Sequence, residues 1–187
     1  MLVFDVAKRT QMVTPVANSS LDVAYWFFNR AEQDNLYLET DKVHHLLFWA
    51  QSRYAQSPYY KMLMPCLFLC DDNGFFEPNL KRIFEQGRPF MPPVQFEASL
   101  SKFLEQIWNE FRTKSLSQCK KLMTQHPLYN EFYQQGSTTL IPWEALTRQI
   151  NHTPTNSFTP FSKKILVSQN GPVVVSPWAP RKVNKEG

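Results

Sequence analysis

The sequence predicts a mainly α-helical protein, in which a compact multi-helix domain with a short extended segment precedes a C-terminal β-hairpin tail. Apolar residues recur every three or four positions through most of residues 20–150, which is the period of helices with one buried side. Proline, glycine and Asp–Asn breaks divide this stretch into pieces of helical length. From residue 163 the period changes, because two β-prone runs flank Asn170–Gly171, a strong hairpin signal.

By composition, the chain of 187 residues divides into four parts. Residues 1–18 show no clear period and form an N-terminal arm. Residues 19–150 hold the helical domain, and a hydrophobic content of 43% is ample for its core. Residues 151–162 form a polar linker, and residues 163–187 form the β-hairpin and a basic tail.

Two helices open the domain. Ser19 and Ser20 offer N-caps for a helix that runs to about residue 34, where Asp34–Asn35 breaks it. Thr40 is expected to cap a second helix, which Ser57–Pro58 ends.

The next stretch is the least regular of the domain. The segment "MLMPCLFLC" (62–70) is apolar and short, and its period does not decide between an extended segment and a buried half-helix. The following "DDNG" (71–74) is a turn. Pro78 suits the first position of a short helix, and Gly87 ends it.

The strongest helical stripe begins at Phe96 and continues for about four turns to Phe111. Ser115 and Gln118 then form a capping box, which predicts a helix through Met123. Two further short helices are expected over 128–133 and 142–150.

Charge and cysteine usage narrow the class of protein. Residues 161–187 hold five basic residues and one acidic residue, which accounts for the whole net charge of +4 and weakens a nucleic-acid interpretation of the domain. The odd count of three cysteines does not suggest a disulfide framework. No apolar run is long enough to span a bilayer and no secretory signal is evident, so we expect a cytoplasmic protein without membrane contact.

The sequence signals for a catalytic or metal-binding site are weak. His44 and His45 are adjacent, and successive helical residues point about 100° apart, so they do not converge on one metal ion. Cys66 and Cys70 have no matching Cys or His pair, and no Walker, dinucleotide, GxSxG or HExxH motif is present. A hydrolase that pairs Cys119 with a histidine is the least favoured option. We therefore expect no metal, no cofactor and no enzymatic activity.

The second helix is apolar nearly all round. One side carries Val43 and Leu47, the expected core face, while His45, Phe48 and Trp49 cluster on the other. Such a helix is either central in a bundle or presents its second face to a partner, and the period leaves both alternatives open.

Three segments of the domain resemble one known family. They are "VAYWFFNRA" with "KVHHLLFWAQ" (23–31 and 42–51), "NGFFEPNLKRIF" (73–84) and "LSQCKKLMTQHPLYNEFY" (116–133). In order and spacing the chain resembles the SocA-like, or Panacea, antitoxin domain family, often labelled phage-associated protein. It departs from the family pattern at His44, His45 and Phe75, where the family commonly has glutamine, lysine and proline.

The resemblance implies an α-helical, non-enzymatic antitoxin that neutralises a partner toxin by direct contact. A homo-oligomer is left open, and the alternative is a nucleic-acid-associated phage or regulatory protein that uses the basic tail. From the two-faced helix and the matched segments, the residues expected to meet a protein partner are Lys42, His45, Phe48, Trp49, Gly74, Glu77 and Pro78.

Overall fold

The computed structural model describes residues 14–56, 61–148, 164–168 and 171–175. Contacts divide the chain into two compact units, residues 1–151 and residues 152–187. Residues 1–13 of the predicted arm (1–18), the linker over 151–162 and the tail beyond 175 lie outside the described residues.

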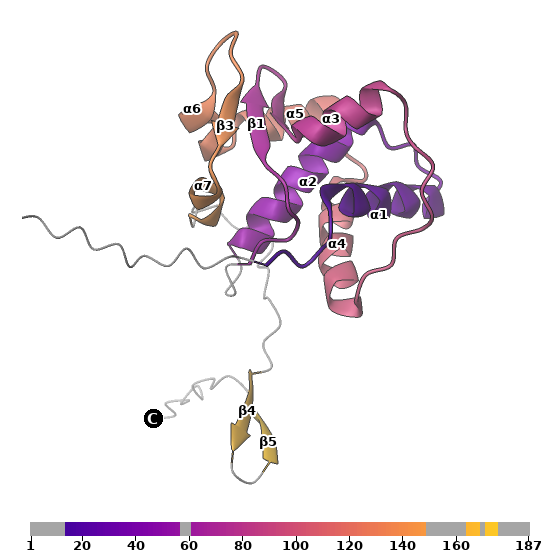
Figure 1. The fold of residues 1–187 in the computed structure, drawn as a ribbon, viewed down its shortest axis with the longest axis vertical. Coiled ribbons are helices and arrows are strands. Elements are labelled where there is room, and N and C mark those ends of the chain that lie inside the picture. The colour runs from indigo at the N-terminus through magenta and orange to yellow at the C-terminus, as the bar shows by residue number, and fades with distance from the viewer. Residues whose placement is uncertain (1–13, 57–60, 149–163, 169–170, 176–187) are drawn as a thin grey trace, which may run out of the picture. The chain divides into compact units, whose positions relative to one another are not determined.

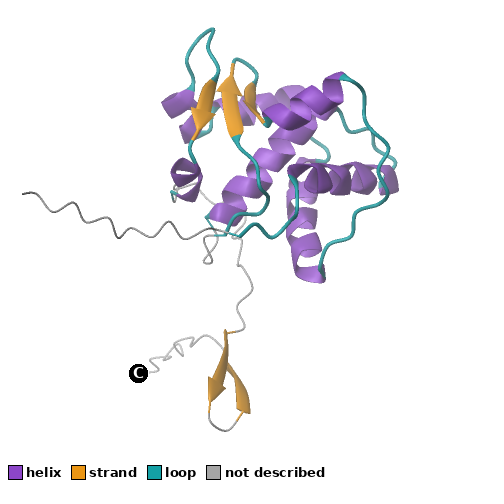
Figure 2. Cartoon of the chain, viewed as in Figure 1, coloured by secondary structure: helices purple, strands orange, loops and turns teal. Residues whose placement is uncertain are grey.

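The described part of the chain is mainly α-helical, as the sequence predicts (Figures 1 and 2). The helices are α1 (Ser20–Gln33), α2 (Thr40–Ala55), α3 (Pro78–Glu85), α4 (Ala98–Phe111), α5 (Leu116–Thr124), α6 (Pro127–Phe132) and α7 (Trp143–Thr147). The strands are β1 (Phe68–Asp71), β2 (Gly74–Phe76), β3 (Thr139–Ile141), β4 (Lys164–Ser168) and β5 (Gly171–Val175).

Local capping explains several helix starts. The Ser19 hydroxyl accepts a hydrogen bond from the Asp22 N–H at 3.0 Å, and the expected capping box of Ser115 and Gln118 opens α5. The prediction for α2 was wrong by one residue: its N-cap is Glu39, and no side chain caps it. Helix α2 therefore depends on packing for its stability.

Helix α2 runs through the middle of the first unit and contacts α1, α4, α5, α7 and β2 (Figure 1). Every side chain from Lys42 to Ser52 is buried. Of the two alternatives left by the sequence, the structure shows the central helix, covered on all sides by its own chain.

A small antiparallel sheet with the order β2-β1-β3 packs beside α2. Leu69 lies opposite Phe76 in β2, and Phe68 lies opposite Ile141 in β3. The segment 62–70, which the sequence left undecided, thus ends in a strand. Strand β3 was not predicted, because three residues are too few to show a period of two.

In the second unit, β4 and β5 pair as an antiparallel hairpin, with Ser168 opposite Gly171. This agrees with the hairpin that the sequence predicts. Within the described part of the chain, no helix is both long enough and apolar enough to cross a bilayer.

Candidate functional site

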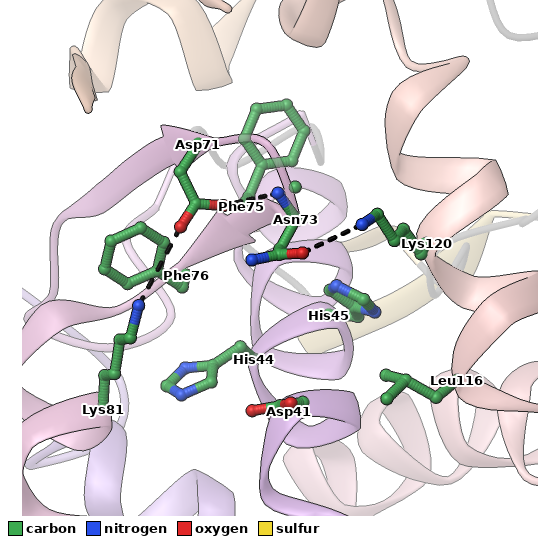
Figure 3. Close-up of a pocket in the computed structure, with 11 residues that line it drawn as sticks. Asp41, His44, His45, Asp71, Asn73, Phe75, Phe76, Lys81, Leu116 and Lys120 are labelled. Carbon is green, nitrogen blue, oxygen red and sulfur yellow. Dashed lines mark hydrogen bonds and ion pairs between the residues drawn. The ribbon is translucent and has the colours of Figure 1, made fainter. Parts of the chain in front are cut away.

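A cavity of about 290 Å³ opens where the start of α2 meets the β1–β2 turn, α3 and α5 (Figure 3). Asp41, His44 and His45 enter it from α2, because residues three and four positions after Asp41 lie on either side of it on the same face of the helix. The other polar lining residues are Asp71 and Asn73 from the β1–β2 hairpin, Lys81 from α3 and Lys120 from α5.

His44 is held in one tautomer by the backbone of Glu77. The Glu77 N–H donates to His44 Nδ1 at 3.3 Å, so the proton of the neutral ring lies on Nε2. Burial lowers the pKa of His44 to about 4; Asp41 opposes this shift, and His45 and Lys81 add smaller lowering effects. Among the described residues Nε2 has no hydrogen-bond partner, so this lining residue offers the cavity an unused donor.

His45, like His44, is only 5% exposed. Burial lowers its pKa to about 4; the Asn73 backbone and Asp41 favour the charged form, whereas Lys120 opposes it. Its Nδ1 is buried without a hydrogen-bond partner in the described part of the chain. Both adjacent histidines are therefore neutral at pH 7.

Gly74 allows the β1–β2 turn to approach His45 closely. Its φ of +117° is rarely adopted by residues with a side chain, and an added Cβ would lie 3.4 Å from His45 Nε2 and 3.2 Å from Met123 Cβ. Gly74 is thus a steric requirement of the cavity wall.

The charged groups around the cavity are unequally paired. Asp71 lies 3.9 Å from the Lys81 ammonium and also accepts from the Asn73 N–H at 2.7 Å. Lys120 donates to the side-chain oxygen of Asn73 at 2.9 Å, a neutral partner. The exposed Asp41 carboxylate has no hydrogen bond or ion pair within the described residues.

The aromatic face of α2 that was a candidate for partner contact is covered by its own chain. Phe48 has no exposed surface and stacks on Phe75 with ring centroids 4.0 Å apart. Trp49 is 8% exposed and stacks on Phe111 of α4 at 5.7 Å. The expectation that these rings meet a partner does not hold in this fold, because β2 and α4 already occupy their surfaces.

Lys42 and Glu77, two other expected partner residues, have structural contacts instead. The Lys42 ammonium donates to the carbonyls of Arg112 (3.2 Å) and Lys114 (2.5 Å), just after the end of α4. Glu77 is fully buried and caps α3, where its carboxylate accepts from the Leu80 N–H at 2.6 Å. Both side chains fix helix ends and have little or no surface for a partner.

The other three residues expected to meet a partner lie in different places. His45 and Gly74 line the cavity, while Pro78 begins α3 and is half-buried. Three lining residues were not predicted from the sequence: Asn73, Lys81 and Lys120. They come from three segments of the chain, and no spacing between them indicates a common site. Their only signal was the Asp–Asn–Gly turn that places Asn73.

No set of three side chains suited to hold a metal ion gathers among the residues that the structure describes. Cys119 is fully buried, and burial raises the pKa of its thiol, so it stays protonated at neutral pH. The nearby His126 caps α6 by accepting from the Leu128 N–H at 3.2 Å.

Comparison of the chain with protein-family models, curated proteins and solved structures gave no match. The function of the chain is therefore inferred from the resemblance of its three segments and from the residues that line the cavity.

Proposed function

We propose that the chain is a non-enzymatic protein-binding module, the antitoxin of a toxin–antitoxin pair, and that it neutralises a partner toxin in the cytoplasm by direct contact. The class of protein comes from the resemblance of three segments to the SocA-like, or Panacea, domain.

One observation supports the proposal most strongly. The three segments that carry the resemblance lie far apart in the sequence, yet each contributes residues to the lining of the same cavity, the first through its stretch 42–51 and not through 23–31. Segment 42–51 supplies its histidines, 73–84 its turn and Lys81, and 116–133 Leu116 and Lys120. A shared recognition surface is a physical reason for these segments to recur together.

Because the aromatic face of α2 is buried, the surface left for a partner is the edge of the cavity, which we call the pocket rim. We define the pocket rim as Asp41, Asn73, Lys81 and Lys120, which are exposed or half-exposed. Rim charges of this kind steer association and choose between partners more than they add affinity. The partner surface that fits it carries charges of both signs.

Co-expression tests the proposal. The chain should restore growth when the product of the neighbouring gene is toxic, and the two proteins should co-purify in a fixed ratio. Lys81→Glu should weaken co-purification, whereas Arg82→Glu, the same charge change at the next position of α3, should not. A non-toxic neighbour together with no stoichiometric partner would overturn the proposal.

The concentration of basic residues in 161–187 favours a second candidate, a nucleic-acid-associated regulatory protein. A gel shift that weakens with salt and disappears when residues 161–187 are deleted would support this candidate. The absence of any shift at low salt would exclude it.

A further inference from the structure

Among the charged side chains that line the cavity, one cation and one anion have no oppositely charged partner. Asp71 offsets Lys81 at 3.9 Å, and Lys81 also lies over the Phe76 ring at 4.3 Å. Lys120 meets only the neutral amide of Asn73, and Asp41 meets no partner in the described chain. An uncompensated cation and an uncompensated anion therefore line the same small space.

The two unmatched charges line the same cavity as His45. Asp41 raises the pKa of His45 and Lys120 lowers it. His45 lines the cavity, is nine-tenths buried and keeps an unpartnered Nδ1 within the described structure. A buried polar nitrogen without a partner is costly, so its place beside the wall of the cavity calls for a functional explanation.

Donors for an anionic group are present next to Lys120. The Asn73 side-chain oxygen is used by Lys120, which leaves its NH₂ group without a partner among the described residues. His44 adds the Nε2–H donor that its contact with Glu77 fixes. Figure 3 shows Lys120 and Asn73 on one side of the histidines and Asp41 below them.

We propose that this cavity binds a small zwitterion of the free α-amino acid class, with its carboxylate at Lys120 and Asn73 and its ammonium at Asp41. A simple anion would leave Asp41 facing it, and a simple cation would leave Lys120 facing it. A zwitterion satisfies both groups at once. Phe76 and Leu116 supply apolar surface for the side chain of the amino acid.

The size of the cavity fits this class. Its volume of about 290 Å³ lies just below the usual range of small-molecule pockets, roughly 300–1,000 Å³, so it suits an amino acid better than a nucleotide. Amino acid binding does not depend on the proposed antitoxin role, because the chain alone would bind the ligand.

Binding is measured on the full chain with the twenty free amino acids, one at a time. The readout is the imidazole resonances of His44 and His45 in nuclear magnetic resonance spectra, which report this cavity directly. At least one amino acid should shift both sets of resonances in a saturable manner. The N-acetyl and the carboxamide derivatives of that amino acid, which each lack one charge, should bind at least about tenfold more weakly.

Variants with matched controls complete the test. Asp41→Asn and Lys120→Gln should each weaken binding by about tenfold or more. Asp22→Asn removes the same first-turn charge from α1, and Lys121→Gln removes the neighbouring charge from α5; both should bind as the unaltered chain does. Saturable binding of the N-acetyl derivative or of inorganic phosphate with equal affinity would overturn the zwitterion proposal in favour of an anion site. The absence of any saturable shift across the panel would overturn it altogether.

Discussion

At the scale of single residues, His44 and His45 illustrate how burial decides chemistry. Two adjacent imidazoles suggest a metal or acid–base pair, but each has its pKa lowered to about 4 by burial. Both are therefore neutral hydrogen-bonding groups at pH 7, and their protonation competes with folding.

Stability should fall as the pH falls from about 6.5 to about 4, because the unfolded chain takes up protons in this range that the folded chain excludes. Each histidine contributes at most about 3 kcal/mol to this loss, at 1.36 kcal/mol per pKa unit. Urea unfolding at a series of pH values measures it. His44→Gln should flatten the fall relative to the unaltered chain; two parallel curves would contradict a buried neutral His44.

Gly74→Ala should destabilise the fold by about 1–3 kcal/mol, since both the φ of +117° and the contacts with Met123 and His45 oppose a Cβ. Gly87→Ala is the matched control, with a φ of +98° and nothing within 4 Å. Chemical unfolding of both variants separates the loss of stability caused by steric contacts of the Cβ from the loss caused by the positive φ. Equal losses would show that the close approach at Gly74 is relaxed in solution.

At the scale of elements, α2 is the helix on which the other elements of the first unit pack. Its second face is covered by two elements: Phe75 of the sheet lies on Phe48, and Phe111 of α4 lies on Trp49. The Arg53 guanidinium closes the outer side of Trp49, 5.1 Å from the ring centre. The second face thus contributes to stability.

Trp49→Ala should cost about 3–5 kcal/mol of stability, the usual range for removing a large buried aromatic side chain. Thermal and urea unfolding measure the loss. Trp143→Ala, at a half-buried position in α7, is the control and should cost less. If Trp49→Ala leaves stability unchanged but abolishes binding of a partner, the ring belongs to an interface after all.

At the scale of the whole molecule, the two units differ in what supports them. The first unit has a continuous apolar core drawn from its helices and its sheet. The second holds a single described hairpin, and an isolated two-stranded hairpin is marginally stable in water.

A chain shortened after Asn151 should therefore keep the helical circular dichroism and the unfolding midpoint of the full chain. A shift of several degrees in the midpoint would show that residues 152–187 contribute to the stability of the first unit. The shortened chain also provides the control for the gel-shift experiment, because it lacks the excess of basic residues.

Much of the fold was predictable, because helix caps and breakers act locally. Ser19, the capping box at Ser115 and the proline at 78 fix their helix ends within a few residues, so the sequence alone reveals them. The role of the second face of α2 was not predictable, since an apolar side chain has the same pattern whether its own chain or another covers it. The pocket rim was hidden for another reason: long-range packing brings its members together.

The central position of α2 has a consequence for synthesis. This helix is complete once residue 55 has been made, whereas the elements that cover it continue to Thr147 in α7. During translation, a helix that is apolar nearly all round remains without most of its cover, which is the condition under which nascent chains aggregate or recruit chaperones. We expect overproduced chain to depend on chaperone supply, with slow translation downstream of residue 55 lowering its recovered yield.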